Sequence, residues 1–201
     1  MSTLEAAEKR LEEDLNILAA MATVMTPYLD STAVYYPLAH ATFPRLTLGS
    51  YLMRQHRLLA VRDELSTIED GKLETAVSQA EQAIGERVVR VEQKGEEEVR
   101  IRLRQWKQTV KELRERTEQE APYYATTVEN RVILAALLQY LQHKTYRFDV
   151  SLQDDTGAVD QKLHAIWQSG PFVWPDVWEP AYDEDVYWWL YGRPLSTAII
   201  P

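Results

Sequence analysis

Apolar residues near the amino terminus recur with the spacing of a helix. Two sets, each repeating every seven residues, follow one another along the chain: Leu11, Leu18 and Met25, and Leu15, Ala22 and Leu29. On a helix of about 3.6 residues per turn, the two sets make one continuous apolar strip. We therefore expect a first helix that begins near Ser2, ends at Pro27 and packs along a partner in the manner of a coiled coil.

A second amphipathic stretch predicts a helix over 46–68. Its expected core-facing residues are Leu48, Leu52, Leu59 and Leu65. The Glu-Asp-Gly sequence at 69–71 is expected to end this helix. The connection over 27–45 contains prolines and aromatic residues without helical spacing, so we expect it to be irregular.

The segment from Lys72 to Glu120 contains no proline and predicts one very long helix. Its valines at 77, 88, 99 and 110 are eleven residues apart, which keeps one face of a nearly straight helix apolar. The alternative is a hairpin broken at Gly95, because Lys94 and Gly95 resemble a helix end and three glutamates follow. We favour the continuous helix over about 72–120, because the eleven-residue spacing passes through Gly95.

The remainder of the chain predicts two further helices. A helix is expected over 126–142, and it is apolar nearly all round from Val132 to Leu141, which is typical of a central, buried helix. A short helix is expected over 156–168, and 146–152 is expected to be an extended connection rather than part of a sheet. The fold class is therefore all-α: an elongated helical bundle over 1–170, followed by an irregular segment over 171–201 that packs on the bundle and is not an independent domain.

This carboxy-terminal segment is rich in proline and aromatic residues. Four of the six tryptophans and four prolines lie between 171 and 194. The candidate partner-binding residues are Trp174, Trp178, Tyr187, Trp188, Trp189 and Tyr191. Such rings each bury about 150–250 Å² when covered, which is too much apolar surface to leave in water. The rings pack on the chain's own helices or contact another molecule. Both can hold if some rings pack inward and others face outward.

Composition and charge narrow the function classes. The chain has 201 residues, a net charge of −9 and no cysteine, so disulfides and cysteine-based chemistry are excluded. Neither the charged amino terminus nor any apolar run resembles a signal peptide or a membrane-spanning helix. We expect a cytoplasmic protein without membrane contact.

Local motifs for catalysis or cofactor binding are not found in the sequence. The seven glycines form no nucleotide-binding loop, and no Glu-x-x-His pair occurs. Asp160 and His164 share a helical face, but we expect them to be an ordinary solvated pair rather than a metal site. His56 and Arg131 are the polar residues that a site assembled in three dimensions would use first. We expect no cofactor or metal. Whether the chain is an enzyme stays open, and the sequence favours a protein that is not an enzyme.

Basic residues gather in the long helix, and acidic residues follow from Asp149 onward. A nucleic-acid contact would use Arg100, Arg104, Lys107 and Lys111, but a net charge of −9 opposes it. Mixed charge along a long helix is usually a solvated face with ion pairs between residues four apart, and we expect that here. The alternative is that the acidic part of the chain folds against the basic helix.

These patterns favour a non-enzymatic helical interaction or scaffold protein, expected to self-associate or to bind a protein partner through the carboxy-terminal aromatic segment. An enzyme with a site between the bundle and a carboxy-terminal lid is the alternative. A nucleic-acid-associated factor that uses the basic helix is the weaker alternative.

Overall fold

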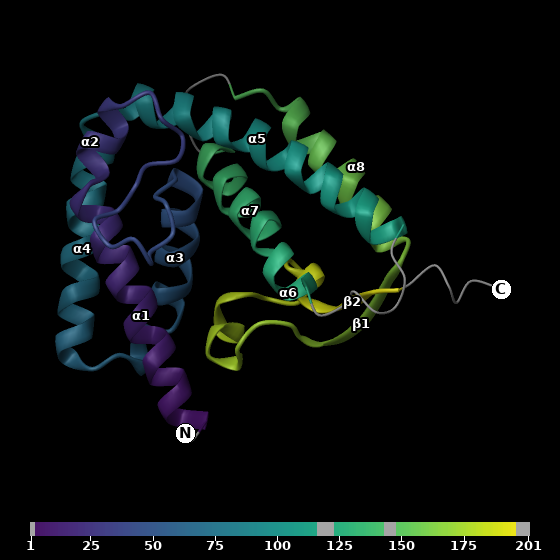
Figure 1. Cartoon of the computed structure of the whole chain (residues 1–201), viewed down its shortest axis with the longest axis horizontal. Helices are drawn as coiled ribbons and strands as arrows, with labels where there is room; N and C mark the ends of the chain where they lie inside the picture. The colour runs from purple at the N-terminus through teal and green to yellow at the C-terminus, as the bar shows by residue number, and fades with distance from the viewer. Residues whose placement is uncertain (1–2, 116–122, 143–147, 196–201) are drawn as a thin grey trace. The chain divides into compact units, whose positions relative to one another are not determined.

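The computed structural model describes residues 3–115, 123–142 and 148–195. The chain divides into two compact units, Met1–Glu98 and Val99–Pro201, and the division falls inside a long helix. The expected boundary at residue 170 lies within the second unit. The prediction of an all-α fold is confirmed, with one small two-stranded sheet added to it (Figure 1).

The first unit is built from helices. These are α1 (Thr3–Thr23), α2 (Met25–Asp30), α3 (Leu48–Ala60), the short 3-10 helix η1 (Arg62–Glu64), α4 (Thr67–Gly85) and the beginning of α5 (Val88–Glu115). Helix α1 lies beside α3 and α4 (Figure 1). All six residues of the predicted strip are at most 4% exposed, which confirms that they are core residues. Met25 and Leu29 lie on α2 rather than on α1.

Pro27 does not end the first helix. Helix α1 ends at Thr23, and Pro27 lies in the first turn of α2. A proline is tolerated there because the backbone N–H groups of the first turn have no partner within the helix. The chain then runs irregularly to Leu46, as expected, with one backbone bridge between Tyr36 and Leu46.

The predicted second helix is shorter than expected. Helix α3 ends at Ala60, and Ser66 begins α4, with its hydroxyl accepting the N–H of Glu69 and the Glu69 carboxylate accepting the N–H of Ser66. This reciprocal capping box starts a helix where 69–71 was expected to end one. Acidic residues stabilise the first turn of α4 through the helix dipole.

The predicted long helix is present, but it begins at Val88. Helix α4 ends at Gly85, and the chain turns at Glu86 and Arg87. Arg87 pairs there with Asp30 at the end of α2, with 2.8 Å between Nε and Oδ1. The eleven-residue spacing does not continue across this turn, since Val88 is 44% exposed whereas Val99 is fully buried.

Helix α5 continues through Gly95, which confirms the continuous course that the sequence favoured there. The buried residues around Gly95 include charged ones. Lys94 donates from Nζ to the carbonyl of Ala33 at 2.7 Å and lies over the ring of Tyr28, and Glu98 accepts the N–H of Gly49 at 2.9 Å. These bonds explain why a Lys-Gly-Glu sequence is held in a helix. The expected end of the helix, over 116–120, lies outside the described residues.

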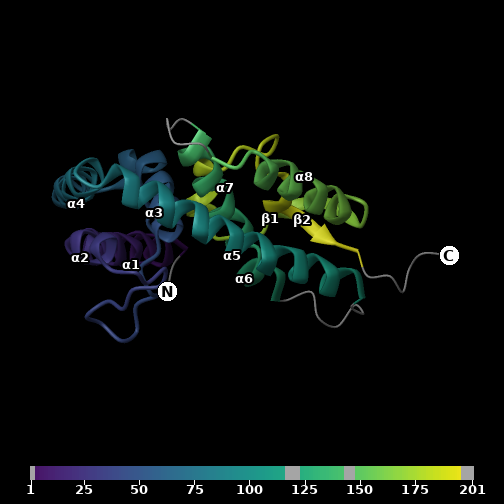
Figure 2. The ribbon, with the colours of Figure 1, turned by 90° about the horizontal axis from the view of Figure 1, so that it is seen from above.

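The second unit contains the rest of α5, then α6 (Tyr124–Thr127), α7 (Glu129–Gln142), α8 (Ser151–His164), β1 (Trp167–Phe172), the 3-10 helices η3 (Asp176–Ala181) and η4 (Trp188–Leu190), and β2 (Tyr191–Pro194). Helix α8 runs beside the carboxy-terminal part of α5, as both ribbon views show (Figure 2). The buried character of α7 is confirmed, with Leu134 and Leu137 fully covered.

Strands β1 and β2 form an antiparallel pair that the sequence did not predict. Trp167 pairs with Pro194 and Ser169 with Gly192, and the register shifts between Ser169 and Phe172. Residues 167 and 168 were expected to end a helix, and helix α8 stops earlier, at His164. No helix in the described part of the chain combines the length and the apolar character that crossing a bilayer requires.

Candidate functional site

The six predicted contact residues lie together in the second unit. Trp178, Tyr187 and Trp189 are buried, whereas Trp174, Trp188 and Tyr191 are half-buried. The sequence therefore identified a real aromatic cluster, but its members differ in exposure. Only the half-buried rings offer a face to another molecule.

The rings of this cluster pack in a connected series. The centroid distances are 5.4 Å for Trp174 and Tyr182, 5.0 Å for Tyr182 and Tyr187, 5.7 Å for Tyr187 and Trp189, 5.7 Å for Trp189 and Trp188, and 5.3 Å for Trp188 and Trp167. All five pairs meet edge to face, the arrangement that the charge distribution of aromatic rings favours. Packing of this kind fixes the orientation of Trp174 and Trp188, whereas Tyr191 packs on Phe172 at a centroid distance of 5.2 Å.

Hydrogen bonds tie the segment to α6. The hydroxyl of Tyr124 donates to the carbonyl of Trp189 at 2.7 Å, and the indole Nε1 of Trp174 donates to the carbonyl of Ala125 at 2.7 Å. Burial raises the pKa of Tyr124 well above its usual range, so its hydroxyl stays protonated as a donor. The segment is therefore docked on its own unit.

A buried ion pair lies beneath this docked segment. Arg131 donates from Nη2 to Oδ2 of Asp160 at 2.7 Å and from Nε to Oδ1 at 3.0 Å. The indole of the fully buried Trp106 donates to the same carboxylate at 2.9 Å. The guanidinium carbon of Arg131 lies 3.8 Å from the centre of a ring of Trp189. One guanidinium thus contacts α8 through a carboxylate and the segment through an indole.

Two buried donors near this ion pair have no hydrogen-bond partner among the described residues. They are Nη1 of Arg131 and Nε1 of Trp189. The sequence pointed to Arg131, but it paired Asp160 with His164. His164 is exposed, and its ring packs against Trp188 at 4.9 Å. No group of three metal-ligating side chains occurs in the described ranges.

Further acidic residues of the second unit pair with α5. Asp149 lies 3.0 Å from Arg100 and Asp155 lies 2.7 Å from Lys107. Together with the bond from Trp106 to Asp160, these contacts place Asp149, Asp155 and Asp160 against the basic helix, as the alternative interpretation of the charge pattern predicted. They also neutralise two of the four bases that a nucleic-acid contact would use.

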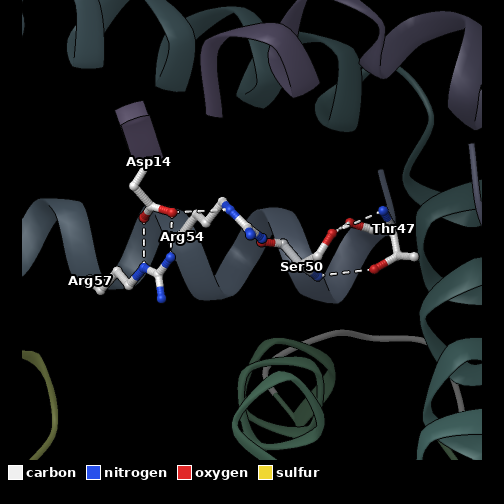
Figure 3. Close-up of polar contacts among 5 residues, drawn as sticks. All are labelled: Asp14, Thr47, Ser50, Arg54 and Arg57. Carbon is white, nitrogen blue, oxygen red and sulfur yellow. Dashed lines mark hydrogen bonds and ion pairs between the residues drawn. The ribbon is translucent and has the colours of Figure 1, made fainter. Parts of the chain in front are cut away.

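The first unit has its own buried ion cluster (Figure 3). Asp14 of α1 accepts both Nε, at 2.6 Å, and Nη2 of Arg57, and Nε of Arg54 lies 3.2 Å from its Oδ1. Arg54 also donates to the carbonyl of Ser50, which forms the capping box of α3 with Thr47. These bonds fasten α1 to α3 and explain the packing of the unit. His56, also on α3, is half-buried.

We take the half-buried rings of Trp174, Trp188 and Tyr191 as the candidate site and call this set the aromatic surface. Val186, on the same segment, is 59% exposed. Asp183, Glu184 and Asp185 are exposed beside it in sequence. An arrangement of fixed rings with acidic neighbours suits binding rather than proton transfer or metal chemistry.

Comparison with known proteins adds no further assignment. No family model, curated protein or solved structure matches this chain. Function is therefore inferred from the burial, contacts and charges of the chain's own side chains.

Proposed function

We propose that this protein is a non-enzymatic helical interaction protein that self-associates through the aromatic surface of its second unit. The observation that carries the proposal is the position of Trp188. Its ring is half-buried, yet it is held by His164, Trp167 and Trp189 at centroid distances of 4.9, 5.3 and 5.7 Å.

A ring held in this way is suited to binding. Association costs free energy when side chains must be ordered, and a ring that is already packed on its neighbours loses little further freedom. Tryptophan and tyrosine also dominate the residues whose removal weakens protein interfaces most. The buried members of the cluster support the half-buried members, so the whole segment serves one contact.

The neighbouring charges give the proposed contact a distinctive response to salt. In a symmetric dimer the same surface of each copy meets the other, so Asp183, Glu184 and Asp185 approach their own counterparts. Like charges repel, and added salt screens the repulsion. Association through the aromatic surface should therefore strengthen as the salt concentration rises.

Point substitutions test this proposal better than removal of the segment. A chain ending at Gly170 would lose Trp189 and strand β2, and with them the contacts that bury Arg131. We would compare Val186→Glu and Trp188→Ala with Val150→Glu, a control at a valine that is 70% exposed elsewhere in the same unit. Sedimentation equilibrium measures the association constant of each.

The expected result is that wild type and Val150→Glu associate equally, whereas Val186→Glu and Trp188→Ala associate at least about tenfold more weakly. Circular dichroism verifies that each variant keeps its helices. Wild-type protein that stays monomeric at every concentration, or two aromatic-surface variants that associate like wild type, would contradict the proposal.

A further inference from the structure

A groove between α5 and α8 of the second unit carries surplus positive charge. Its volume is about 720 Å³. Four basic and two acidic side chains line it: Lys107, Lys111, Arg114 and Lys162, with Glu115 and Asp155. This is a local excess of two positive charges on a chain whose net charge is −9.

The groove offers a ligand charged side chains as well as apolar surface, which includes the exposed Ala158. The apolar residues beneath it, Val110, Val159 and Ile166, are each at most 8% exposed. Lys107 is paired with Asp155. Lys111, Arg114 and Lys162 are exposed and form no ion pair with any residue in the described ranges. Three cations on one groove, without anionic partners among the described residues, favour an acidic occupant.

The first unit presents a surface of the opposite charge. A hollow between α1 and the start of α4 is lined by five glutamates and one lysine, together with Leu65 and Ser66: Glu5, Glu8, Glu12, Glu64 and Glu69, and Lys9. Glu8, Glu12 and Glu64 are exposed. We call this set the acidic face.

The acidic face and the groove also match in spacing. Along α1 the acids at 5, 8 and 12 are separated by three and then four residues. Along α5 the bases at 107, 111 and 114 are separated by four and then three. Positions three and four apart lie on one side of a helix, so two antiparallel helices would bring all three acids opposite all three bases.

We propose that the groove of one copy binds the acidic face of a second copy. This inference rests on the self-association in the proposed function, and it adds a second contact that is distinct from the aromatic surface. The two surfaces differ, so the contact runs head to tail, and each copy retains one free surface of each kind. Assembly through this contact continues beyond a dimer unless a ring closes.

The experiment exchanges the charges of the two surfaces. The groove variant carries Lys111→Glu and Arg114→Glu, and the face variant carries Glu5→Lys and Glu8→Lys, the positions that lie opposite one another in the antiparallel alignment. All four side chains are exposed, so the helices that bear them should be unaffected. A third variant combines all four substitutions. Sedimentation velocity is run on each variant, and on the groove and face variants mixed, at about 50 mM and about 500 mM NaCl, where screening differs strongly.

The expected result is a loss followed by a rescue. The groove variant and the face variant should each associate about tenfold more weakly than wild type in low salt, because like charges now meet. Their mixture and the four-charge variant should associate within about threefold of wild type, because opposite charges meet again. This association should weaken as salt is added, in contrast to that through the aromatic surface.

Other outcomes separate this inference from the proposed function. If the groove and face variants associate like wild type while Trp188→Ala does not, the inference is overturned and the proposed function stands. A monomeric wild type overturns both. Salt-sensitive binding of a duplex oligonucleotide that the groove variant loses, without any change in self-association, overturns the inference and assigns the groove to nucleic acid.

Discussion

The guanidinium carbon of Arg131 lies 3.8 Å from the centre of a ring of Trp189, and the same guanidinium is paired with Asp160. Helix α7, helix α8 and the carboxy-terminal segment therefore meet at one side chain. The segment that presents the aromatic surface is fixed in place by the core of its own unit.

Loss of Asp160 should strongly destabilise the second unit. The side chains of Arg131 and Asp160 are 8% and 14% exposed, so Asp160→Ala leaves a buried guanidinium without its counterion. Removing one partner of a buried pair typically costs about 3–5 kcal/mol. Urea denaturation followed by tryptophan fluorescence measures the change. Replacing both residues, with Arg131→Met and Asp160→Leu, should cost less than Asp160→Ala, and the opposite order would contradict a buried pair.

An analogous loss is expected in the first unit. Asp14 is 4% exposed and holds Arg54 and Arg57 on α3, so Asp14→Ala should lower the free energy of unfolding by about 3 kcal/mol or more. The matched control is Asp70→Ala, because Asp70 pairs with Arg62 at the surface. Denaturant unfolding should show a much smaller loss for the control, since water screens both the exposed pair and the interaction of Asp70 with the helix dipole. Equal losses of unfolding free energy in the two variants would refute the distinction between the buried and the exposed ion pair.

Alkaline pH should weaken the fold through its buried tyrosines. Burial raises the pKa of Tyr51, so above about pH 10 the unfolded chain loses this proton while the folded chain keeps it. Stability is unaffected below that pH and then falls by about 1.4 kcal/mol per pH unit for each such tyrosine. Unfolding in urea between about pH 8 and about pH 12 measures the slope.

Tyr51→Phe tests the source of this pH dependence. Its hydroxyl is buried without a hydrogen-bond partner in the described part of the chain, so at neutral pH the substitution should be neutral or stabilising. It should also make the alkaline slope shallower. Tyr124→Phe is the comparison, because it deletes the bond to the carbonyl of Trp189 and should cost about 1 kcal/mol at neutral pH. A large neutral-pH loss from Tyr51→Phe would show that its hydroxyl is bonded.

Gly192 should be irreplaceable in the β1–β2 pair. Its φ is +133°, and a β-carbon there would lie 2.1 Å from the carbonyl oxygen of Gln168. Gly192→Ala should therefore displace strand β2 and destabilise the unit. Gly157→Ala is the control, since nothing lies near that position in α8, and it should stabilise by about 0.5–1 kcal/mol. Thermal unfolding distinguishes them, and a Gly192→Ala variant as stable as wild type would rule out this close approach.

The spacing of hydrophobic residues correctly predicted the helices whose apolar residues form a single strip. The strips of α1 and α7 are buried as expected, because core packing dominates the stability of such helices. The turn at Glu86 and Arg87 has a local cue in Gly85, and it is accompanied by a pair between Arg87 and Asp30, which are 57 residues apart. The β1–β2 pair depends on the approach of Gln168 to Gly192, which strand alternation does not reveal.

The candidate site was predictable in content but not in geometry. Tryptophan content located the segment, because exposed indoles are costly. The pairing of Arg131 with Asp160 was not predictable, because the two residues are 29 positions apart in the sequence. His164, four positions from Asp160, was a nearer candidate partner for that carboxylate. Which of the six rings are buried and which are half-buried depends on which side of the carboxy-terminal segment faces α6 and α7.

The aromatic surface can be tested most directly through the indole N–H signals of the six tryptophans in nuclear magnetic resonance spectra, assigned by single Trp→Phe variants. Dilution of the protein in high salt should shift the signal of Trp188, which is half-buried, and leave that of the fully buried Trp106 unchanged. A Trp188 signal that stays constant at every concentration would contradict self-association through this surface.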